Sequence, residues 1–283
     1  MDKLKAKSQQ YSDTTVVTEE PVYNCPKCKD EGGYLVRKKA GETTLLQNGD
    51  EIILKYDTEE WQKCECAKIR QLNRLIKSSA ITEEFQKMSF KNFSTDGVHP
   101  IVAEMKSKAN QYYAAFDEIK GYRQNSIMLI GQPGCGKTHL LTAISNYLMH
   151  AKQVPVLYFP YKDGMNNIAA NNFERKDEIM NHMKEIDVLF IDDLFKPIGG
   201  KLEYNKDGSP KILKWQVDII FEVVNYRYLN NKPLLISSEL TLDDMLGIDE
   251  ALTSRIFEMA QDFTVTIKKD MKVNYRLRKV MGL

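Results

Sequence analysis

A glycine-rich turn stands between an apolar run and a helix-like run, in "MLIGQPGCGKTHLLTAI" over residues 128–144. Residues 131–138 fit the pattern G-x-x-x-x-G-K-[ST] in full. Glycines let the backbone turn its N–H groups inward, and the following helix adds the positive end of its dipole. In such a loop Lys137 reaches the β- and γ-phosphates and the Thr138 hydroxyl binds Mg²⁺. The stretch therefore predicts a site for a nucleoside triphosphate and Mg²⁺.

The residues expected to line this nucleotide site form one continuous segment with one addition from a later strand. They are Gly131, Gln132, Pro133, Gly134, Cys135, Gly136, Lys137, Thr138, His139 and Asp192.

A later apolar run, "VLFIDD", ends in two carboxylates. At the C-terminal end of a strand, Asp192 can hold Mg²⁺ directly or through water. Asp193 beside it can orient an attacking water and take its proton. Two acids that merely cap a turn are the alternative, and the phosphate loop upstream favours the catalytic interpretation.

Polar residues also end the apolar run of "PLLISSEL", where Ser237, Ser238 and Glu239 follow one another. We expect them between the phosphate loop and the strand of the two aspartates, where they can sense the γ-phosphate. A simple turn explains them about equally well.

The segment "ALTSRIFEM" is helix-like, and Arg255 lies off its apolar face. An arginine in this position can reach the nucleotide of a neighbouring subunit. A surface arginine in a salt bridge is the alternative. The apolar face consists of Leu252, Ile256 and Met259.

Strand and helix patterns alternate over the second part of the chain. This alternation predicts a mostly parallel sheet covered by helices. The strand candidates are 126–131, 155–160, 187–192, 233–238 and 263–268, with helices expected over 101–122, after the glycine loop and before residue 230.

Four of the five cysteines occur in two close pairs, Cys25 with Cys28 in "CPKC" and Cys64 with Cys66 in "CEC". Four thiolates can complete a closed tetrahedral Zn²⁺ site, which is structural rather than catalytic. Four unrelated reduced cysteines are the alternative. The segment between the pairs contains "NGDE" flanked by apolar runs, which predicts a hairpin.

Composition and charge describe a soluble protein with a real core, since 42% of the 283 residues are hydrophobic and 28% are charged. The net charge of +1 excludes nothing about nucleic acid. No run approaches membrane-helix length, and the N-terminus lacks the apolar core of a signal peptide. We therefore expect a cytoplasmic protein without a membrane partner. The expected organisation is a disordered tail (1–20), a zinc-binding domain (21–89) and an α/β P-loop ATPase domain (90–283) that begins with a linker.

Two basic stretches are less specific. "IKKDMKVNYRLRKV" near the C-terminus carries six basic residues around Tyr275 and can contact a DNA backbone, although such a run is more often a solvated tail. "AKIRQLNRLIKSS" is basic and amphipathic, with Ile69, Leu72 and Ile76 at helical spacing. It suits packing on the cysteine module or contact with a partner helix.

In combination these segments resemble the AAA+ ATPases, and among them the DnaC/DnaI-type helicase loaders and the transposition ATPase IstB. The matching runs are "MSFKNF", "GQPGCGKTHLLTAI", "VLFIDDLF", "VNYRYLNNKPLLISSELTLDDM" and "LTSRIFEM". The resemblance implies that Lys137 and Thr138 belong to Walker A, that Asp192 and Asp193 form Walker B, and that Arg255 is the arginine finger. It also implies sensor 1 at Ser238 or Glu239, and since the family often has Asn at the latter position, Ser238 is preferred. Arg227 matches a recurrent arginine, and the chain leaves no room for a C-terminal lid domain.

The resemblance implies an ATP-dependent loader of a DnaB-type hexameric replicative helicase onto single-stranded DNA, from a phage or prophage. Such a protein uses ATP, Mg²⁺ and Zn²⁺, assembles with copies of itself, and docks on the helicase through its zinc domain. An IstB-type ATPase acting on target duplex DNA is the alternative. A nucleotide-binding adaptor fits less well, because Asp193 and Arg255 are both present. A small-molecule P-loop kinase fits least, because it needs neither Arg255 nor a thiolate domain.

Overall fold

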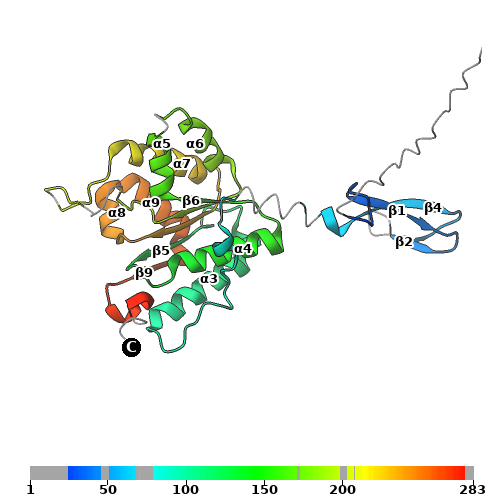
Figure 1. Ribbon diagram of the computed structural model, residues 1–283, viewed down its shortest axis with the longest axis horizontal. Coiled ribbons are helices and arrows are strands. Elements are labelled where there is room, and N and C mark those ends of the chain that lie inside the picture. The colour runs from blue at the N-terminus through cyan, green and yellow to red at the C-terminus, as the bar shows by residue number, and fades with distance from the viewer. Residues whose placement is uncertain are drawn as a thin grey trace, which may run out of the picture. The chain divides into compact units, whose positions relative to one another are not determined.

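The computed structural model describes residues 25–45, 51–67, 70, 79–170, 173–197, 203–206 and 208–277. The chain forms two compact units, Met1–Arg70 and Gln71–Leu283 (Figure 1). No helix within the described ranges is long and apolar enough to cross a bilayer.

The first unit is built from two small antiparallel ribbons. β1 (Gly33–Lys38) pairs with β4 (Thr58–Lys63), and β2 (Thr43–Leu45) pairs with β3 (Glu51–Ile53). The second pairing confirms the hairpin expected around "NGDE", whose turn lies outside the described residues. The helical spacing expected at Ile69, Leu72 and Ile76 also lies outside them.

Little apolar surface is buried among the residues of the first unit that the structure describes. Among its described residues, Cys28 and Cys64 are the buried side chains, at 4% and 5% exposure. Large apolar side chains such as Leu35 and Trp61 are more than half exposed, at 58% and 52%. Since burial of apolar surface is the main force for folding, a unit this poor in core needs another source of stability.

The second unit contains a five-stranded sheet in the order β6-β7-β8-β5-β9, and all neighbouring strands are parallel. Each expected strand is confirmed to within one residue at either end. The strands are β5 (Ile127–Gly131), β6 (Val156–Pro160), β7 (Val188–Asp192), β8 (Leu234–Ser238) and β9 (Thr264–Ile267).

Helices cover both faces of this sheet, as Figure 1 shows. Strand side chains alternate between the two faces, so Ile127 and Leu129 belong to one apolar cluster while Met128 and Ile130 belong to the other. The first face is covered by α3 (Pro100–Ile119) and α4 (Lys137–Lys152). The second is covered by α5 (Tyr161–Ala170), α6 (Lys176–Glu185), α7 (Lys214–Leu229), α8 (Leu242–Ile248) and α9 (Glu250–Ala260). The short elements are α2 (Glu83–Gln86), η1 (Gln261–Phe263) and η2 (Met271–Val273).

Arg227 on α7 is fully buried, at 0% exposure. Its guanidinium donates hydrogen bonds to five backbone carbonyls at the end of α6 and the starts of β7 and β8, and no carboxylate is among these acceptors. Burial lowers its pKa to about 9. The carbonyls belong to Met183, Lys184, Ile186, Asp187 and Pro233. The arginine therefore links the end of α6 to the starts of β7 and β8 through hydrogen bonds, which is a structural role.

The segment expected to be a linker, residues 89–100, is part of the second unit and contributes to its core. Phe90 and Phe93 are buried at 8% and 7% exposure and join the cluster under α3 and α4. Packing starts earlier still, because Ile81 belongs to the same cluster and the Asn146 amide donates to three carbonyls of residues 85–88. The aromatic residues of this otherwise polar run bury apolar surface in the core, so the segment is packed rather than an extended linker.

Candidate active site

The glycine loop connects β5 to α4 and is in close contact with other segments. Gly134 and Gly136 have φ of 78° and 92°, values that favour glycine. A Cβ on Gly134 would lie 2.3 Å from the Asn274 side chain, and one on Gly136 would lie 2.5 Å from the Phe93 ring. The loop therefore depends on glycine both for its backbone conformation and for its packing.

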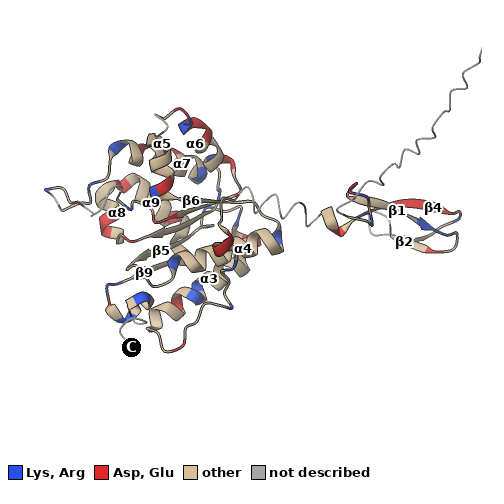
Figure 2. Cartoon of the chain, viewed as in Figure 1, with Lys and Arg blue, Asp and Glu red and all other residues tan. Residues whose placement is uncertain are grey.

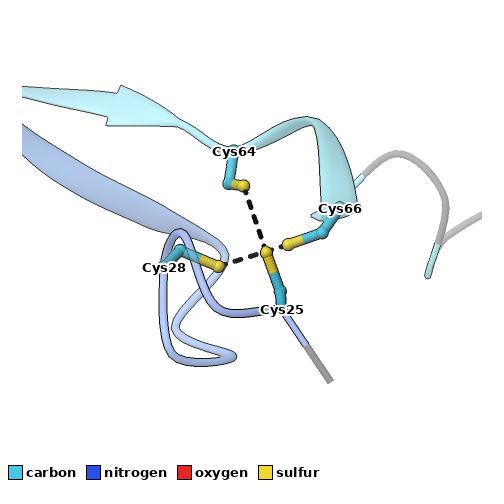
Figure 3. A group of neighbouring side chains, drawn as sticks. All are labelled: Cys25, Cys28, Cys64 and Cys66. Atoms are coloured by element: carbon cyan, nitrogen blue, oxygen red, sulfur yellow. Dashed lines mark hydrogen bonds between the residues drawn. The ribbon is translucent and has the colours of Figure 1, made fainter. Parts of the chain in front are cut away.

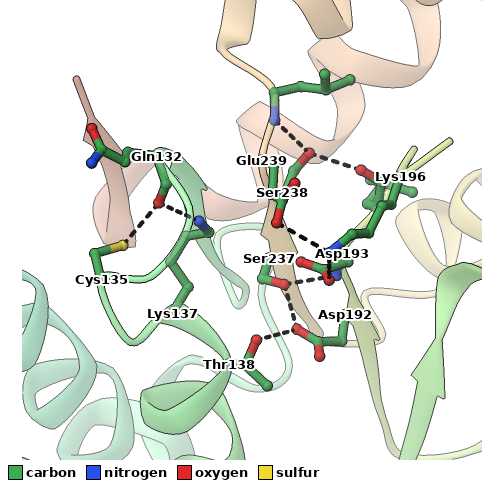
Figure 4. A network of polar contacts seen from close by, with 12 residues as sticks. Gln132, Cys135, Lys137, Thr138, Asp192, Asp193, Lys196, Ser237, Ser238 and Glu239 are labelled. Atoms are coloured by element: carbon green, nitrogen blue, oxygen red, sulfur yellow. Dashed lines mark hydrogen bonds and ion pairs between the residues drawn. The ribbon is translucent and has the colours of Figure 1, made fainter. Parts of the chain in front are cut away.

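Lys137 begins α4 and is nearly buried, at 5% exposure. Its ammonium donates to the carbonyls of Gly131 (2.8 Å) and Gln132 (2.7 Å), so the side chain folds back over the loop (Figure 4). Burial lowers the pKa of this ammonium. An anion in the loop would compensate for the lost solvation, which is the chemistry expected of a phosphate site.

Asp192 ends β7 and accepts hydrogen bonds from three hydroxyl groups. Thr138 Oγ1 donates at 2.8 Å, Tyr158 Oη at 3.1 Å, and Ser237 Oγ donates as well. Burial raises the pKa of this carboxyl group, while the hydroxyl donors act in the opposite direction. Thr138 and Asp192 thus offer adjacent oxygen ligands in a partly desolvated position, a donor set that fits Mg²⁺.

Asp193 leaves the strand with φ of 56°, in the left-handed region. The Ser237 hydroxyl accepts a hydrogen bond from the Asp193 backbone N–H at 2.8 Å and so fixes this turn. The Asp193 carboxylate accepts from Lys196 Nζ at 2.7 Å, and Lys196 also bonds Glu239 at 3.1 Å. The two aspartates therefore lie side by side and both bond Ser237, but only the Asp193 carboxylate accepts a hydrogen bond from Lys196 (Figure 4).

Ser238, the preferred sensor, is not brought into this group. Its hydroxyl donates to the carbonyl of Leu194 at 2.8 Å and is fully buried. The reason is the alternation of strand side chains, which puts Ser237 on the face that carries Thr138 and Asp192 and turns Ser238 to the other face. Glu239, the second choice for the sensor, lines the cavity.

Ser237 is one of the three polar residues expected near the γ-phosphate, although Ser238 is preferred there, whereas Tyr158 and Lys196 are not among the residues that the sequence indicates. Counting in steps of two along β8 would have favoured Ser237 over Ser238. Tyr158 and Lys196 have no comparable signal, since their positions depend on how β6 and the turn after β7 lie beside Asp192.

The candidate site includes a cavity of about 500 Å³. Its phosphate end is formed by the glycine loop from Pro133 to His139 with Asp192, Asp193, Lys196 and Glu239. His139 also reaches out of the loop, with its Nε2 3.1 Å from the Ser89 carbonyl and 3.0 Å from Asn92 Oδ1. The rest of the wall comes from Phe85, Met88, Asn92, Phe93, Ser94, Val98, Val102, Val273, Tyr275 and Arg276.

The C-terminal basic stretch is not a free tail where the structure describes it. The Tyr275 N–H donates to the Gly134 carbonyl at 2.9 Å, and both Tyr275 and Arg276 line the cavity. Its last basic residues, Arg278 and Lys279, lie outside the described residues. Elsewhere on the second unit, basic and acidic residues are interspersed along the helices (Figure 2), in agreement with the small net charge.

Arg255 lies on α9 and does not line this cavity. Its guanidinium carbon is 5.4 Å from the Phe221 ring centre and 5.6 Å from that of Tyr228, and Nη1 donates to the Ala251 carbonyl at 2.7 Å. Among the hydrogen bonds described, its buried Nε has no acceptor. The arginine is thus separate from the nucleotide cavity of its own chain.

The four paired cysteines of the first unit come together, with sulfur atoms all within 4.8 Å of one another (Figure 3). Cys25 Sγ lies 3.7 Å from Cys64 Sγ, and Cys28 Sγ lies 3.3 Å from Cys66 Sγ. A tetrahedral ion with Zn–S bonds of about 2.3 Å would separate its sulfur ligands by roughly 3.8 Å. All four are free thiols, so the group fits a metal rather than a disulfide framework.

Neighbouring groups also suit an anionic thiolate cluster. Arg70 Nη2 donates to Cys66 Sγ at 3.2 Å, and Arg70 Nη1 donates to the Asp30 carbonyl at 2.7 Å. Four thiolates around one divalent ion carry excess negative charge, which a guanidinium offsets. The cluster and its arginine therefore have the composition of a structural Zn²⁺ site.

Comparison with known proteins agrees with this geometry. Residues 86–261 match the bacterial DnaA ATPase domain. YqaM of Bacillus subtilis (strain 168), an uncharacterised protein, is 44% identical over 98% of this chain and 94% of its own length. XkdC, from the phage-like element PBSX of the same organism, is 44% identical over 91% of this chain and 88% of its own length.

Solved structures show the same fold. The DnaC helicase loader is 20% identical with a TM-score of 0.53, over 66% of this chain and 100% of that one. DnaI is 19% identical with a TM-score of 0.51, over 67% of this chain and 94% of that one. The family match, the parallel sheet and the glycine loop lead to one conclusion: the chain belongs to the family of the bacterial DnaA ATPase domain, a group of AAA+ P-loop ATPases.

Proposed function

We propose that this protein is an ATP-dependent loader that places a DnaB-type replicative helicase on single-stranded DNA during phage or prophage replication. The observation that carries this proposal is the combination of an AAA+ nucleotide site with a separate four-cysteine unit in one chain. The structural likeness to proteins described as a DnaC helicase loader and as DnaI supports it, as does the relative from a phage-like element.

In this proposal each group of the cavity has one task. Lys137 and the N–H groups of the glycine loop hold the phosphates, and Thr138 with Asp192 would hold Mg²⁺, which offsets the charge that develops on the phosphates. Asp193 orients the attacking water and accepts its proton. Ser237 holds Asp193 in position through the backbone N–H.

Asp193→Asn should lower ATP turnover by about 10²–10⁴-fold and leave ATP affinity almost unchanged. The amide keeps the shape of the carboxylate but cannot take a proton from water. Steady-state phosphate release and equilibrium binding of a fluorescent ATP analogue measure the two effects separately. Asp187→Asn is the matched control, because Asp187 does not line the cavity, and its ATP turnover and affinity should equal those of the unsubstituted protein. Turnover by Asp193→Asn at the unchanged rate would remove Asp193 from the catalytic role.

The loading step itself can be tested on closed circular single-stranded DNA, which a helicase ring enters only if the ring opens. The protein, ATP and Mg²⁺ should together increase unwinding of an annealed oligonucleotide by the replicative helicase of the bacterium that carries the chain. Asp193→Asn should support no repeated loading. If unwinding is unaffected while the protein binds duplex DNA in an ATP-dependent way, the transposition ATPase becomes the better hypothesis.

A further inference from the structure

Three charged side chains meet at the rim of the nucleotide cavity. Lys196, from the turn after β7, lies between Asp193 and Glu239, at 2.7 Å and 3.1 Å from their carboxylates (Figure 4). The three side chains are 30–36% exposed and line the cavity that also contains Lys137 and Thr138. The ammonium therefore bridges the carboxylate of Asp193, the proposed catalytic group, and that of Glu239, which directly follows β8.

This bridge has a consequence for the proposed base. Asp193 already gives one of its oxygens, Oδ2, to an ammonium, which neutralises the charge that would attract the proton of a water molecule. As long as Lys196 occupies this position, Asp193 is restrained from acting on water.

Lys196 is well suited to leave that position. Burial would lower its pKa, but the hydrogen bonds and charges of Asp193 and Glu239 raise it, so the side chain stays an ammonium at neutral pH. A lysine head is a point charge on a flexible stem and can exchange one anion for another without a fixed geometry. A terminal phosphate carries more negative charge than a carboxylate, and its oxygens are the stronger partners.

We infer that Lys196 distinguishes ATP from ADP in this site, by moving from Asp193 to the third phosphate and thereby freeing Asp193 to act on water. Glu239 competes with the third phosphate for the same ammonium and so limits this exchange. The inference rests on the proposed nucleotide-binding function of the cavity. It also gives Glu239 a role, since its carboxylate holds the ammonium when the third phosphate is absent and competes with that phosphate when it is present.

The test uses the full-length protein and four variants. Lys196→Met removes the ammonium, Lys196→Arg keeps the charge, and Glu239→Gln removes the competing carboxylate. Lys214→Met is the matched control, because Lys214 forms an exposed ion pair with Asp218 and does not line the nucleotide cavity. The measurement is the equilibrium affinity for ADP and for a non-hydrolysable ATP analogue, both with Mg²⁺, followed by ATP turnover.

Lys196→Met should weaken binding of the ATP analogue by about 10- to 100-fold, the usual range for a charge-assisted hydrogen bond, and change ADP affinity less than about two-fold. Lys196→Arg should restore most of the preference. Glu239→Gln should have the opposite effect on affinity and strengthen binding of the ATP analogue by about two- to five-fold.

Equal weakening of ATP-analogue and ADP binding in Lys196→Met would overturn the inference, since it would give Lys196 a merely structural role. So would a Glu239→Gln variant that loses ATP preference as Lys196→Met does. If the unchanged protein binds neither nucleotide, the proposed function itself fails. If it binds both and Lys196→Met keeps the same preference, only the inference about Lys196 fails.

Discussion

Replacing Arg255 with alanine should reduce ATP turnover by about 10³–10⁵-fold, the range associated with arginine fingers. Arg255 does not line the nucleotide cavity of its own chain, so it can act only on the nucleotide of another copy. Its guanidinium lies near two aromatic rings, and its Nε has no acceptor among the described contacts. Such a group gives up little interaction energy when it moves to bind a phosphate. The affinity for ATP should change little.

The decisive form of this experiment mixes two inactive variants. Arg255→Ala keeps an intact cavity and Asp193→Asn keeps an intact finger, so mixed assemblies should regain part of the activity that each lacks alone. Arg123→Ala is the matched control, because Arg123 lies 3.8 Å from the same Tyr228 ring but has no assigned catalytic role. Turnover by Arg255→Ala close to that of the Arg123→Ala control would refute the role, and so would the absence of complementation in the mixture.

Loss of the metal should unfold the first unit and leave the second unit folded. The first unit buries little besides Cys28 and Cys64 among its described residues, whereas structural Zn²⁺ sites contribute about 10–16 kcal/mol to folding. Cys28→Ser combined with Cys64→Ser should therefore abolish bound metal and expose residues 25–70 to proteolysis. ATP turnover, which depends on the second unit, should be kept.

Metal content by mass spectrometry and limited proteolysis of the full-length chain measure this prediction. One Zn²⁺ per chain is expected before substitution and none after it. Cys135→Ser is the matched cysteine variant and should keep the metal, because Cys135 lies in the glycine loop and bonds the Gln132 carbonyl. A first unit that resists proteolysis equally well without metal would show that the ion is not structural.

Features set by local pattern could be predicted from the sequence. The five strands follow from short apolar runs, and the glycine loop follows from a spacing of glycines, lysine and threonine that is specific to phosphate-binding loops. The two aspartates could be found because they end one of these apolar runs. The cysteine group could also be predicted, because two close pairs of cysteines are typical of a metal site. These signals do not depend on how distant segments pack.

What could not be predicted depends on tertiary contacts. Phe93 lies in a polar run that has neither helix nor strand periodicity, yet its ring lies close to Gly136 and lines the cavity. In the sequence, Lys196 is one of several charged residues in a polar loop, and no local pattern predicts that the turn after β7 places it beside Glu239. Arg227 could be read as a functional arginine, although its contacts are all with backbone carbonyls.

If the protein is a helicase loader as proposed, we expect its cysteine unit to bind the replicative helicase, and co-sedimentation with that helicase tests this most directly. Full-length protein should be compared with residues 79–283, with ATP and Mg²⁺ present. The shorter chain begins at 79 because Ile81, Phe90 and Phe93 are part of the core of the second unit. A complex formed by the full-length chain and lost by the shorter one is the predicted result. No complex with either chain at micromolar concentration would contradict the loader proposal.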